Sequence, residues 1–259
     1  MSKYDLNDSL EYQKRKSFYG NLLTIYGRKA VLEALQDTGL DIFRLHLAES
    51  NQNSKIMQAI IGFAKKRHVE ILYHDRKALA YISRNGKQDQ GIAADIQCAG
   101  YQSAEEFLKN NNHSCETRLL ALDGITNPQN LGMIIRTACA GNIDAIILPG
   151  KGNAGLGPLA IKASVGTVFK AEIIRCEVLI PVLKQYQQAG FRVCSLVAEA
   201  SESLFDYSGK HPSIFVLGNE SDGISKDVRT LTDHKLSIPM RNGVESLNVA
   251  VTASLIAFL

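Results

Sequence analysis

The chain has 259 residues, enough for one large domain or two ordinary ones, and its 45% hydrophobic and 21% charged residues are typical of a globular protein. The formal net charge of +3 is too small to indicate any class of partner. Its five cysteines form no Cys-x-x-Cys pair, so neither a zinc site nor a redox dithiol is indicated.

The polar stretch at residues 1–17 is expected to be a flexible tail, because it has no apolar periodicity. A basic arm for nucleic acid, carried by residues 14–16, is the alternative interpretation. The stretch also lacks the apolar core of a signal peptide, and no later run approaches the ~18 apolar residues of a membrane helix. We therefore expect a cytoplasmic protein without membrane contact.

Residues 18–98 predict a small α/β domain. Helical and strand patterns alternate along it, with helices expected at 28–35, 54–66 and 75–82 and strands at 43–48, 69–73 and 91–97. Residues 99–116 are expected to form a linker, because they are largely polar and weakly patterned.

Positive charge is concentrated in the first domain. Residues 55–90 carry eight Lys and Arg against three Asp and Glu, a net of +5, whereas residues 117–259 carry 13 against 12, a net of +1. The loop at 84–91 is either plain surface or an RNA contact, in which its cations would bind phosphates. The candidate RNA-binding residues are Lys65, Lys66, Arg67, Arg84 and Lys87.

Residues 117–259 predict a second domain built on a parallel sheet. Six short apolar strands alternate with helices, which is typical of a parallel sheet covered on both faces. The expected strands are 118–123, 145–148, 171–174, 191–197, 214–217 and 235–238, and the expected helices are 130–140, 159–165, 179–189 and 247–259.

Three stretches of the second domain carry the most specific signal. They are Asn-Pro-Gln-Asn-Leu-Gly-Met-Ile-Ile-Arg-Thr at 127–137, Leu-Gly-Asn-Glu-Ser-Asp-Gly-Ile at 217–224, and Ile-Pro-Met at 238–240 followed by Glu-Ser-Leu-Asn-Val-Ala at 245–250. In this order and spacing they resemble the motifs of the SpoU-type (TrmH-like) RNA ribose 2′-O-methyltransferases of the SPOUT superfamily. The resemblance implies a trefoil knot in the second domain, which periodicity does not reveal, and RNA substrate binding by the first.

The resemblance also implies the chemistry and the partners. Family members transfer a methyl group from S-adenosylmethionine to a ribose 2′-hydroxyl of RNA, need no metal, and are typically homodimers. Ribosomal RNA is the preferred substrate here, because this chain has an added N-terminal domain, whereas single-domain relatives more often act on tRNA. The alternatives are a tRNA 2′-O-methyltransferase and a non-catalytic RNA-binding or ribosome-assembly protein. A Rossmann-type oxidoreductase is disfavoured, since no dinucleotide-binding pattern occurs in residues 213–259.

Matching the motifs residue by residue gives the candidate site. The catalytic candidates are Asn130, Arg136, Glu220, Ser246 and Asn248, and the cofactor-binding candidates are Gly218, Ile238 and Leu247. Asn130 and Ser246 are alternatively plain helix N-caps. Arg136 is expected to activate the substrate electrostatically, since a guanidinium pKa above ~12 makes a poor base. Glu220 is either a solvated loop carboxylate or the partner of an arginine such as Arg136.

Overall fold

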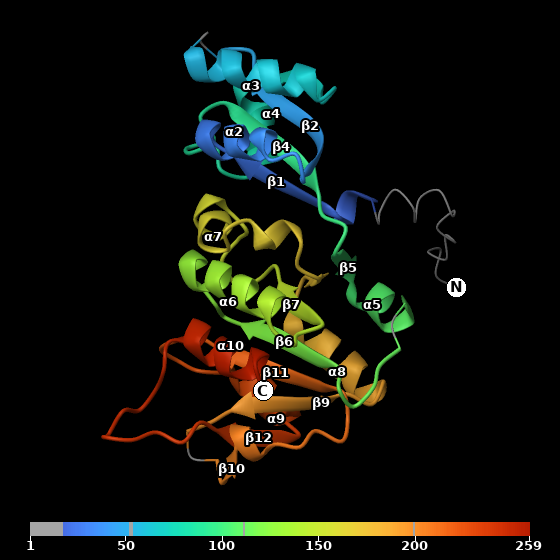
Figure 1. Cartoon of the computed structure of the whole chain (residues 1–259), viewed down its shortest axis with the longest axis vertical. Coiled ribbons are helices and arrows are strands. Elements are labelled where there is room, and N and C mark those ends of the chain that lie inside the picture. Colours follow the sequence, from blue (N-terminus) through green and yellow to red (C-terminus); the bar gives the residue numbers. More distant parts are fainter. Residues whose placement is uncertain (1–17, 52–53, 111, 199) are drawn as a thin grey trace, which may run out of the picture. The chain divides into compact units, whose positions relative to one another are not determined.

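The computed structural model describes residues 18–51, 54–110, 112–198 and 200–259. The predicted tail at 1–17 therefore lies outside the described residues. The chain divides into two compact units at residue 102 (Figure 1). Within the described ranges, no helix is both long and apolar enough to cross a bilayer.

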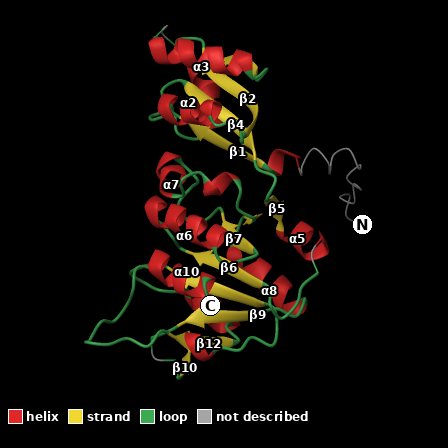
Figure 2. Cartoon of the chain, in the orientation of Figure 1, coloured by secondary structure: helices red, strands yellow, loops and turns green. Residues whose placement is uncertain are grey.

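The first unit is a four-stranded sheet with helices packed on it (Figure 2). The strand order is β1-β4-β2-β3, with β2 and β3 parallel and β4 antiparallel to both of its neighbours. The predicted alternation is present, together with a first strand that the sequence did not suggest. The elements are β1 (Leu22–Tyr26), α2 (Arg28–Gln36), β2 (Asp41–Ala48), α3 (Lys55–Lys66), β3 (Glu70–His74), α4 (Arg76–Ser83) and β4 (Ile92–Gln97).

A polar network crosses the sheet of the first unit. His46, only 4% exposed on β2, lies between two partners: its Nε2 is 3.0 Å from Asp95 Oδ2, and its Nδ1 is 2.9 Å from His74 Nε2. The hydroxyl of Thr24 donates to the other Asp95 oxygen at 2.6 Å. Burial opposes ionisation of Asp95, but the hydrogen bonds from His46 and Thr24 outweigh it and lower the pKa of Asp95.

The second unit is an eight-stranded sheet in the order β10-β12-β9-β11-β6-β7-β8-β5, and the pairs from β10 to β8 are parallel. The α/β fold with a parallel sheet is therefore confirmed. Its strands are β5 (Tyr101–Ser103), β6 (Arg118–Asp123), β7 (Ala145–Pro149), β8 (Ile173–Cys176), β9 (Arg192–Leu196), β10 (Glu202–Ser203), β11 (Ser213–Gly218) and β12 (His234–Ser237). Its helices are α5 (Ala104–Asn110), α6 (Pro128–Ala140), α7 (Pro158–Ala163), η1 (Thr167–Phe169), α8 (Leu179–Gln188), η2 (Leu204–Asp206), α9 (Lys226–Leu231) and α10 (Val249–Ala257).

The segment predicted as a linker, 99–116, differs from that expectation. It holds β5 and α5, and Ala104 and Phe107 on α5 are buried in the core of the second unit. The apolar pattern of this segment is weak, because α5 is short and mostly polar, with Ala104 and Phe107 buried and Leu108 partly buried against the same core.

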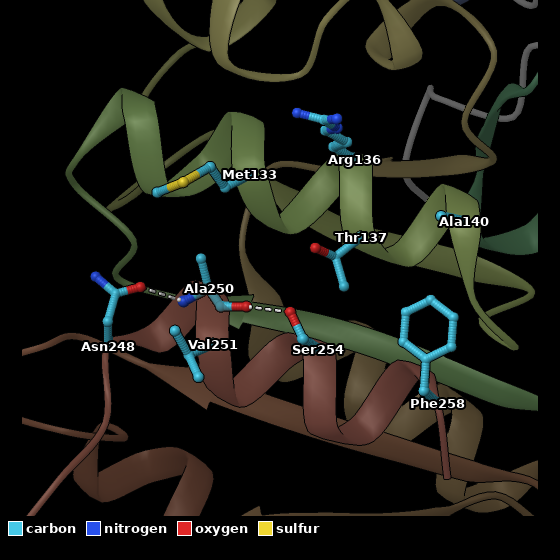
Figure 3. Close-up of a pocket in the computed structure, with 9 residues that line it drawn as sticks. All are labelled: Met133, Arg136, Thr137, Ala140, Asn248, Ala250, Val251, Ser254 and Phe258. Carbon is cyan, nitrogen blue, oxygen red and sulfur yellow. Dashed lines mark hydrogen bonds between the residues drawn. The ribbon is translucent and has the colours of Figure 1, made fainter.

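Helices α6 and α10 run side by side in the same direction (Figure 3). At their far ends Gly141 closely approaches Ala257, and the amide of Asn142 donates to the Ala257 carbonyl at 2.7 Å. Arg118 Nη1 donates to the carbonyl of Leu259 at 2.8 Å. The last helix is thus tied to the start of β6 and to the end of α6. The trefoil knot stays a prediction.

Asp95→Asn should destabilise the first unit, because it removes the charge from two buried hydrogen bonds. We expect a loss of about 1–3 kcal/mol in chemical denaturation at pH 7. Since the pKa of Asp95 is lower in the folded protein than its ordinary value of 3.8, the charge stabilises above that value and its contribution is lost as the pH falls through the folded pKa.

The gap between wild type and variant should therefore be full at neutral pH and shrink below pH 3.8. Asp41→Asn is the matched control, since Asp41 is an exposed carboxylate at the start of β2 in the same unit. Equal effects of the two substitutions at pH 7 would contradict a stabilising network.

Candidate active site

The candidate motifs meet where the central strands of the second sheet end. β6 and β11 are adjacent and parallel, with Asp123 opposite Gly218 at their last paired positions. β12 lies on the other side of β9 from β11 and points the same way. The loops that follow these three strands therefore leave from one edge of the sheet, which is where parallel α/β sheets bind ligands.

Two side chains brace the loop that follows β11. Asp123 Oδ2 accepts from the amide of Ser225 at 2.7 Å, and Asn219 Nδ2 donates to the carbonyl of Gly124 at 2.8 Å. Asn219 Oδ1 also accepts from the amide of Ser221 at 2.8 Å. Neither Asp123 nor Asn219 is among the site residues predicted from the sequence. The available signal was a polar residue directly at or after the end of an apolar strand.

Gly218 has a structural reason for its identity. A Cβ at this position would collide with the backbone of Gly223 and Ile224, because the loop folds back across the end of β11. Asn219 and Gly223 exchange two backbone hydrogen bonds of 2.9 Å that close this return. A cofactor contact is therefore not needed to explain glycine here, although it stays a prediction.

Three of the predicted catalytic residues form one hydrogen-bonded chain. The amide group of Asn130, which is 6% exposed, donates from Nδ2 to Glu220 Oε1 and accepts at Oδ1 from Asn248 Nδ2 at 3.2 Å. The Oδ1 of Asn248 in turn accepts from the amide of Ala250 at 2.9 Å and caps α10. A residue of α6 therefore joins the loop after β11 to the start of α10.

Two predicted helix caps are wrong. Asn127, not Asn130, caps α6, accepting from the amide of Gln129 at 2.8 Å. Pro128 takes the first helical position, which suits its fixed backbone and missing N–H, so Asn130 lies inside the helix. Asn248, not Ser246, caps α10, and Ser246 is exposed on the preceding loop.

The predicted pairing of Arg136 with Glu220 is also wrong. Glu220 accepts from Asn130 instead, and the guanidinium of the exposed Arg136 makes no hydrogen bond or ion pair with any described residue. In Figure 3 its guanidinium points away from α10. Arg136 follows Asn130 by six residues, so the two side chains leave the helix about 240° apart around its axis. When Asn130 faces inward, Arg136 therefore faces solvent.

A groove of about 550 Å³ lies between α6 and α10 (Figure 3). Its lining is mostly apolar and brings Arg136 and Asn248 to the same hollow. The lining residues are Met133, Arg136, Thr137, Ala140, Asn248, Ala250, Val251, Ser254 and Phe258.

The remaining cofactor candidates flank the loop between β12 and α10. Ile238 is half-buried directly after β12, and Leu247 is 37% exposed just before α10. Between them Asn242 and Gly243 have φ angles of 57° and 71°, and the amide of Val244 closes a tight turn. Neither candidate lines the groove. Among the described residues, no group of three or more His, Cys, Asp or Glu is placed to hold a metal ion.

The loop after β7 fits a dinucleotide-binding pattern, Gly-x-Gly-x-x-Gly, at residues 150–155. That pattern normally leads straight into a helix, whereas α7 begins only at Pro158. Asn153 instead links this loop to β6 and to the residues that follow it. Its Oδ1 accepts from the amide of Ile125 at 2.7 Å, and its Nδ2 donates to the carbonyl of Leu122 at 3.2 Å. The geometry therefore gives no support to a Rossmann-type nucleotide site.

The first unit holds the RNA-binding candidates, and one of them has a different role. Arg67 donates from its guanidinium to the carbonyls of Leu35, Asp37 and Leu40, so it secures the end of α2 and the turn into β2. That use leaves it a structural rather than an RNA-contacting residue. The other four candidates, all of them exposed, are Lys65, Lys66, Arg84 and Lys87.

Comparison with known proteins identifies a family for each unit. Residues 117–258 match the model of the SpoU rRNA Methylase family, and residues 24–102 match the model for RNA 2′-O ribose methyltransferase substrate binding. An uncharacterized tRNA/rRNA methyltransferase of Mycobacterium leprae is 32% identical over 90% of this chain and 75% of its own length. YacO of Bacillus subtilis, assigned to the TrmH family of tRNA/rRNA methyltransferases, is 30% identical over 90% of this chain and 93% of its own length.

Solved structures share the fold. The SpoU methyltransferase AviRb of Streptomyces viridochromogenes, in complex with AdoMet, matches with a TM-score of 0.61 and 20% identity over 96% of this chain and 91% of that one. An AdoMet-bound rRNA methyltransferase of Sinorhizobium meliloti matches with a TM-score of 0.61 and 22% identity over 95% and 88%.

Gly218→Ala should destabilise the second unit by about 1–3 kcal/mol, because the added Cβ forces the returning loop away from β11. Chemical denaturation measures the loss. Gly155→Ala is the control in the same unit, since nothing lies within 4 Å of a Cβ built there. A Gly218→Ala protein as stable as Gly155→Ala would show that the loop does not need this close approach.

Proposed function

Because the chain belongs to the SpoU rRNA methylase family of RNA methyltransferases, we propose that it transfers a methyl group from S-adenosylmethionine to a ribose 2′-hydroxyl of structured RNA in the cytoplasm, with ribosomal RNA preferred over tRNA. The observation that carries the proposal is the chain of hydrogen bonds from Glu220 through Asn130 to Asn248. Motifs that lie far apart in the sequence supply its three members, and it closes at the sheet edge where a ligand is expected.

The methyl donor would be held by backbone groups around Gly218, Ile238 and Leu247. Two observations support this: Gly218 and Ile238 lie at the ends of parallel strands on one edge of the sheet, and Leu247 precedes the helix that Asn248 caps. The AviRb and Sinorhizobium proteins were crystallised with this donor. When bound, S-adenosylmethionine supplies a methyl group on a sulfonium centre.

The side chains have separate roles in the proposed reaction. Asn130 is a positioning residue, because it fixes the Glu220 carboxylate and the Asn248 amide at once. Arg136 has no described partner for its guanidinium, so that group is available to an RNA phosphate or to the ribose hydroxyl. A guanidinium held there would stabilise negative charge on the attacking oxygen without removing the proton itself.

A homodimer is the proposed assembly, with the α6–α10 groove as the contact. Its apolar side chains Met133, Val251 and Phe258 are 40%, 48% and 63% exposed, and Arg136 is the only charged residue in its lining. A two-fold interface pairs one patch with itself, which suits a groove whose lining is mostly apolar. A second copy over this groove would also cover Asn248 and approach Arg136, because both residues line it.

The substrate is tested by mapping the product. Wild-type protein is incubated with labelled S-adenosylmethionine and, separately, unmodified transcripts of ribosomal RNA and of tRNA, and the methylated nucleotide is identified after digestion. Label on the ribose of rRNA is the expected result. Label on tRNA alone would replace the preferred substrate, and label on a base would overturn the 2′-hydroxyl assignment.

Arg136→Ala should lower the rate of methyl transfer by about 100-fold or more while leaving donor binding unchanged. Transfer of labelled methyl to RNA measures the rate, and calorimetry measures donor binding. Lys184→Ala is the control, because Lys184 is an exposed cation on α8 outside the groove. Wild-type rates from Arg136→Ala would remove Arg136 from the mechanism.

Val251→Glu should convert the dimer into a monomer, because the carboxylate would lose its hydration against the apolar side chains of the second copy. Light scattering after gel filtration should change from twice to once the chain mass of 28.4 kDa. Val178→Glu, at a similarly exposed position that does not line the groove, should remain dimeric. A wild-type protein that already runs as a monomer would contradict the proposed assembly.

A further inference from the structure

Tyr81 on α4 is unusually exposed for an aromatic residue. Its side chain is 75% exposed, more than any other large hydrophobic residue in the described part of the chain. The helix does not need it for packing, since Leu79 and Ser83 are the residues that α4 buries. An aromatic ring left in water at this position presents a flat apolar face to a partner.

The cations Lys77, Arg84 and Lys87 lie within six residues of Tyr81 along the chain. Lys77 lies four residues before Tyr81 on α4, an offset that puts two side chains on one face of a helix, and Arg84 follows α4 as its C-cap, with a φ angle of 54°. Lys87 follows in the adjoining loop. We call these four residues the Tyr81 face: Lys77, Tyr81, Arg84 and Lys87. All four are exposed, and none of their side chains has a hydrogen bond, ion pair or ring contact with another described residue.

Asp89, the carboxylate of the adjoining loop, does not neutralise this face. Asp89 is fully buried, and its oxygens accept from Arg76 Nη1 at 3.0 Å, from the Ser83 hydroxyl at 2.9 Å and from the amide of Gly91 at 2.8 Å. The negative charge of Asp89 is therefore bonded within the unit and does not face solvent. The Tyr81 face keeps its positive charge toward solvent.

The loop that carries Arg84 and Lys87 is held in place before any ligand binds. Asn85 Nδ2 donates to the Tyr26 hydroxyl at 2.9 Å, and Gln90 Oε1 accepts from the amide of Arg28 at 3.0 Å. Together with the buried Asp89, these bonds tie the loop to β1, α2 and α4. A polar surface loop fixed this way loses little conformational entropy when it binds a partner.

We propose that the Tyr81 face binds an unpaired nucleotide of the RNA substrate, with the ring of Tyr81 stacked on the base and the three cations on the adjacent phosphates. The inference rests on the proposed function, because it takes RNA as the partner. A base inside an A-form duplex has no free face, so a stacking tyrosine selects a loop, bulge or single-stranded end. The substrate class is thus an RNA with unpaired nucleotides, not a continuous helix.

The test compares two probes on the full-length protein: a fluorescein-labelled single-stranded oligouridylate and a blunt RNA duplex of the same length, with affinity read by anisotropy. Tyr81→Ala should weaken binding of the single strand about five- to 150-fold and leave duplex binding within about twofold. Tyr81→Phe, which keeps the ring, should bind like wild type. Tyr73→Ala is the matched control, because Tyr73 is 59% exposed on the edge strand β3 of the same unit.

A second readout locates the contact directly. Oligouridylate carrying 5-iodouridine should photo-crosslink to Tyr81, as mapped by mass spectrometry, and not to Tyr73. An unchanged single-strand affinity in Tyr81→Ala overturns the proposal. A changed oligomeric mass with unchanged RNA affinity also overturns it and makes the face a protein contact.

Methyl transfer by the wild type to total RNA is measured in parallel. If transfer occurs but Tyr81→Ala binds RNA normally, only the stacking inference fails. If the wild type transfers no methyl group, the proposed function fails, whatever Tyr81 does.

Discussion

One carboxamide, that of Asn130, holds the candidate site together. Its nitrogen donates a hydrogen bond to Glu220 on the loop after β11, and its oxygen accepts one from Asn248 at the start of α10. An amide is the side chain that offers a donor and an acceptor at fixed positions, so it joins a carboxylate to another amide without a mobile proton. Because Asn130 is buried in α6, the geometry of that helix sets the geometry of both loops.

Close backbone packing keeps α6 where Asn130 needs it. A Cβ on Gly132 would collide with the backbone of α7, and one on Gly141 would collide with Ala257 of α10. The helix therefore lies closer to both neighbours than side chains would allow, and it does so at two points along its length. In a close-packed interior such contacts resist small shifts, so the bridge at Asn130 is supported by packing as well as by hydrogen bonds.

Much of the fold followed from the sequence, because apolar strands buried on both faces leave a clear pattern. The approach of residues near 130, 220 and 248 followed from motif order, and the structure brings all three together. The predictions that were wrong concerned choices between similar local hydrogen bonds. An Asn at 127 and an Asn at 130 both favour a helix start, and only the position of Pro128 decides between them. Arg67 was predicted to be free to bind RNA, because the order of charged residues in a sequence does not show which backbone carbonyls lie near a side chain. In the structure it donates to carbonyls at the end of α2.

The parallel course of α6 and α10 also has an electrostatic effect. Each helix carries a partial positive charge at its N-terminus, and here both termini lie beside the same junction. Two aligned macrodipoles repel each other side by side, so the arrangement costs energy unless negative charge lies near those ends. The carboxylate of Glu220, bonded to Asn130, lies there. Its negative charge thus offsets the partial positive charges at the two helix N-termini. This electrostatic role is a reason for a glutamate at this position that is independent of any reaction.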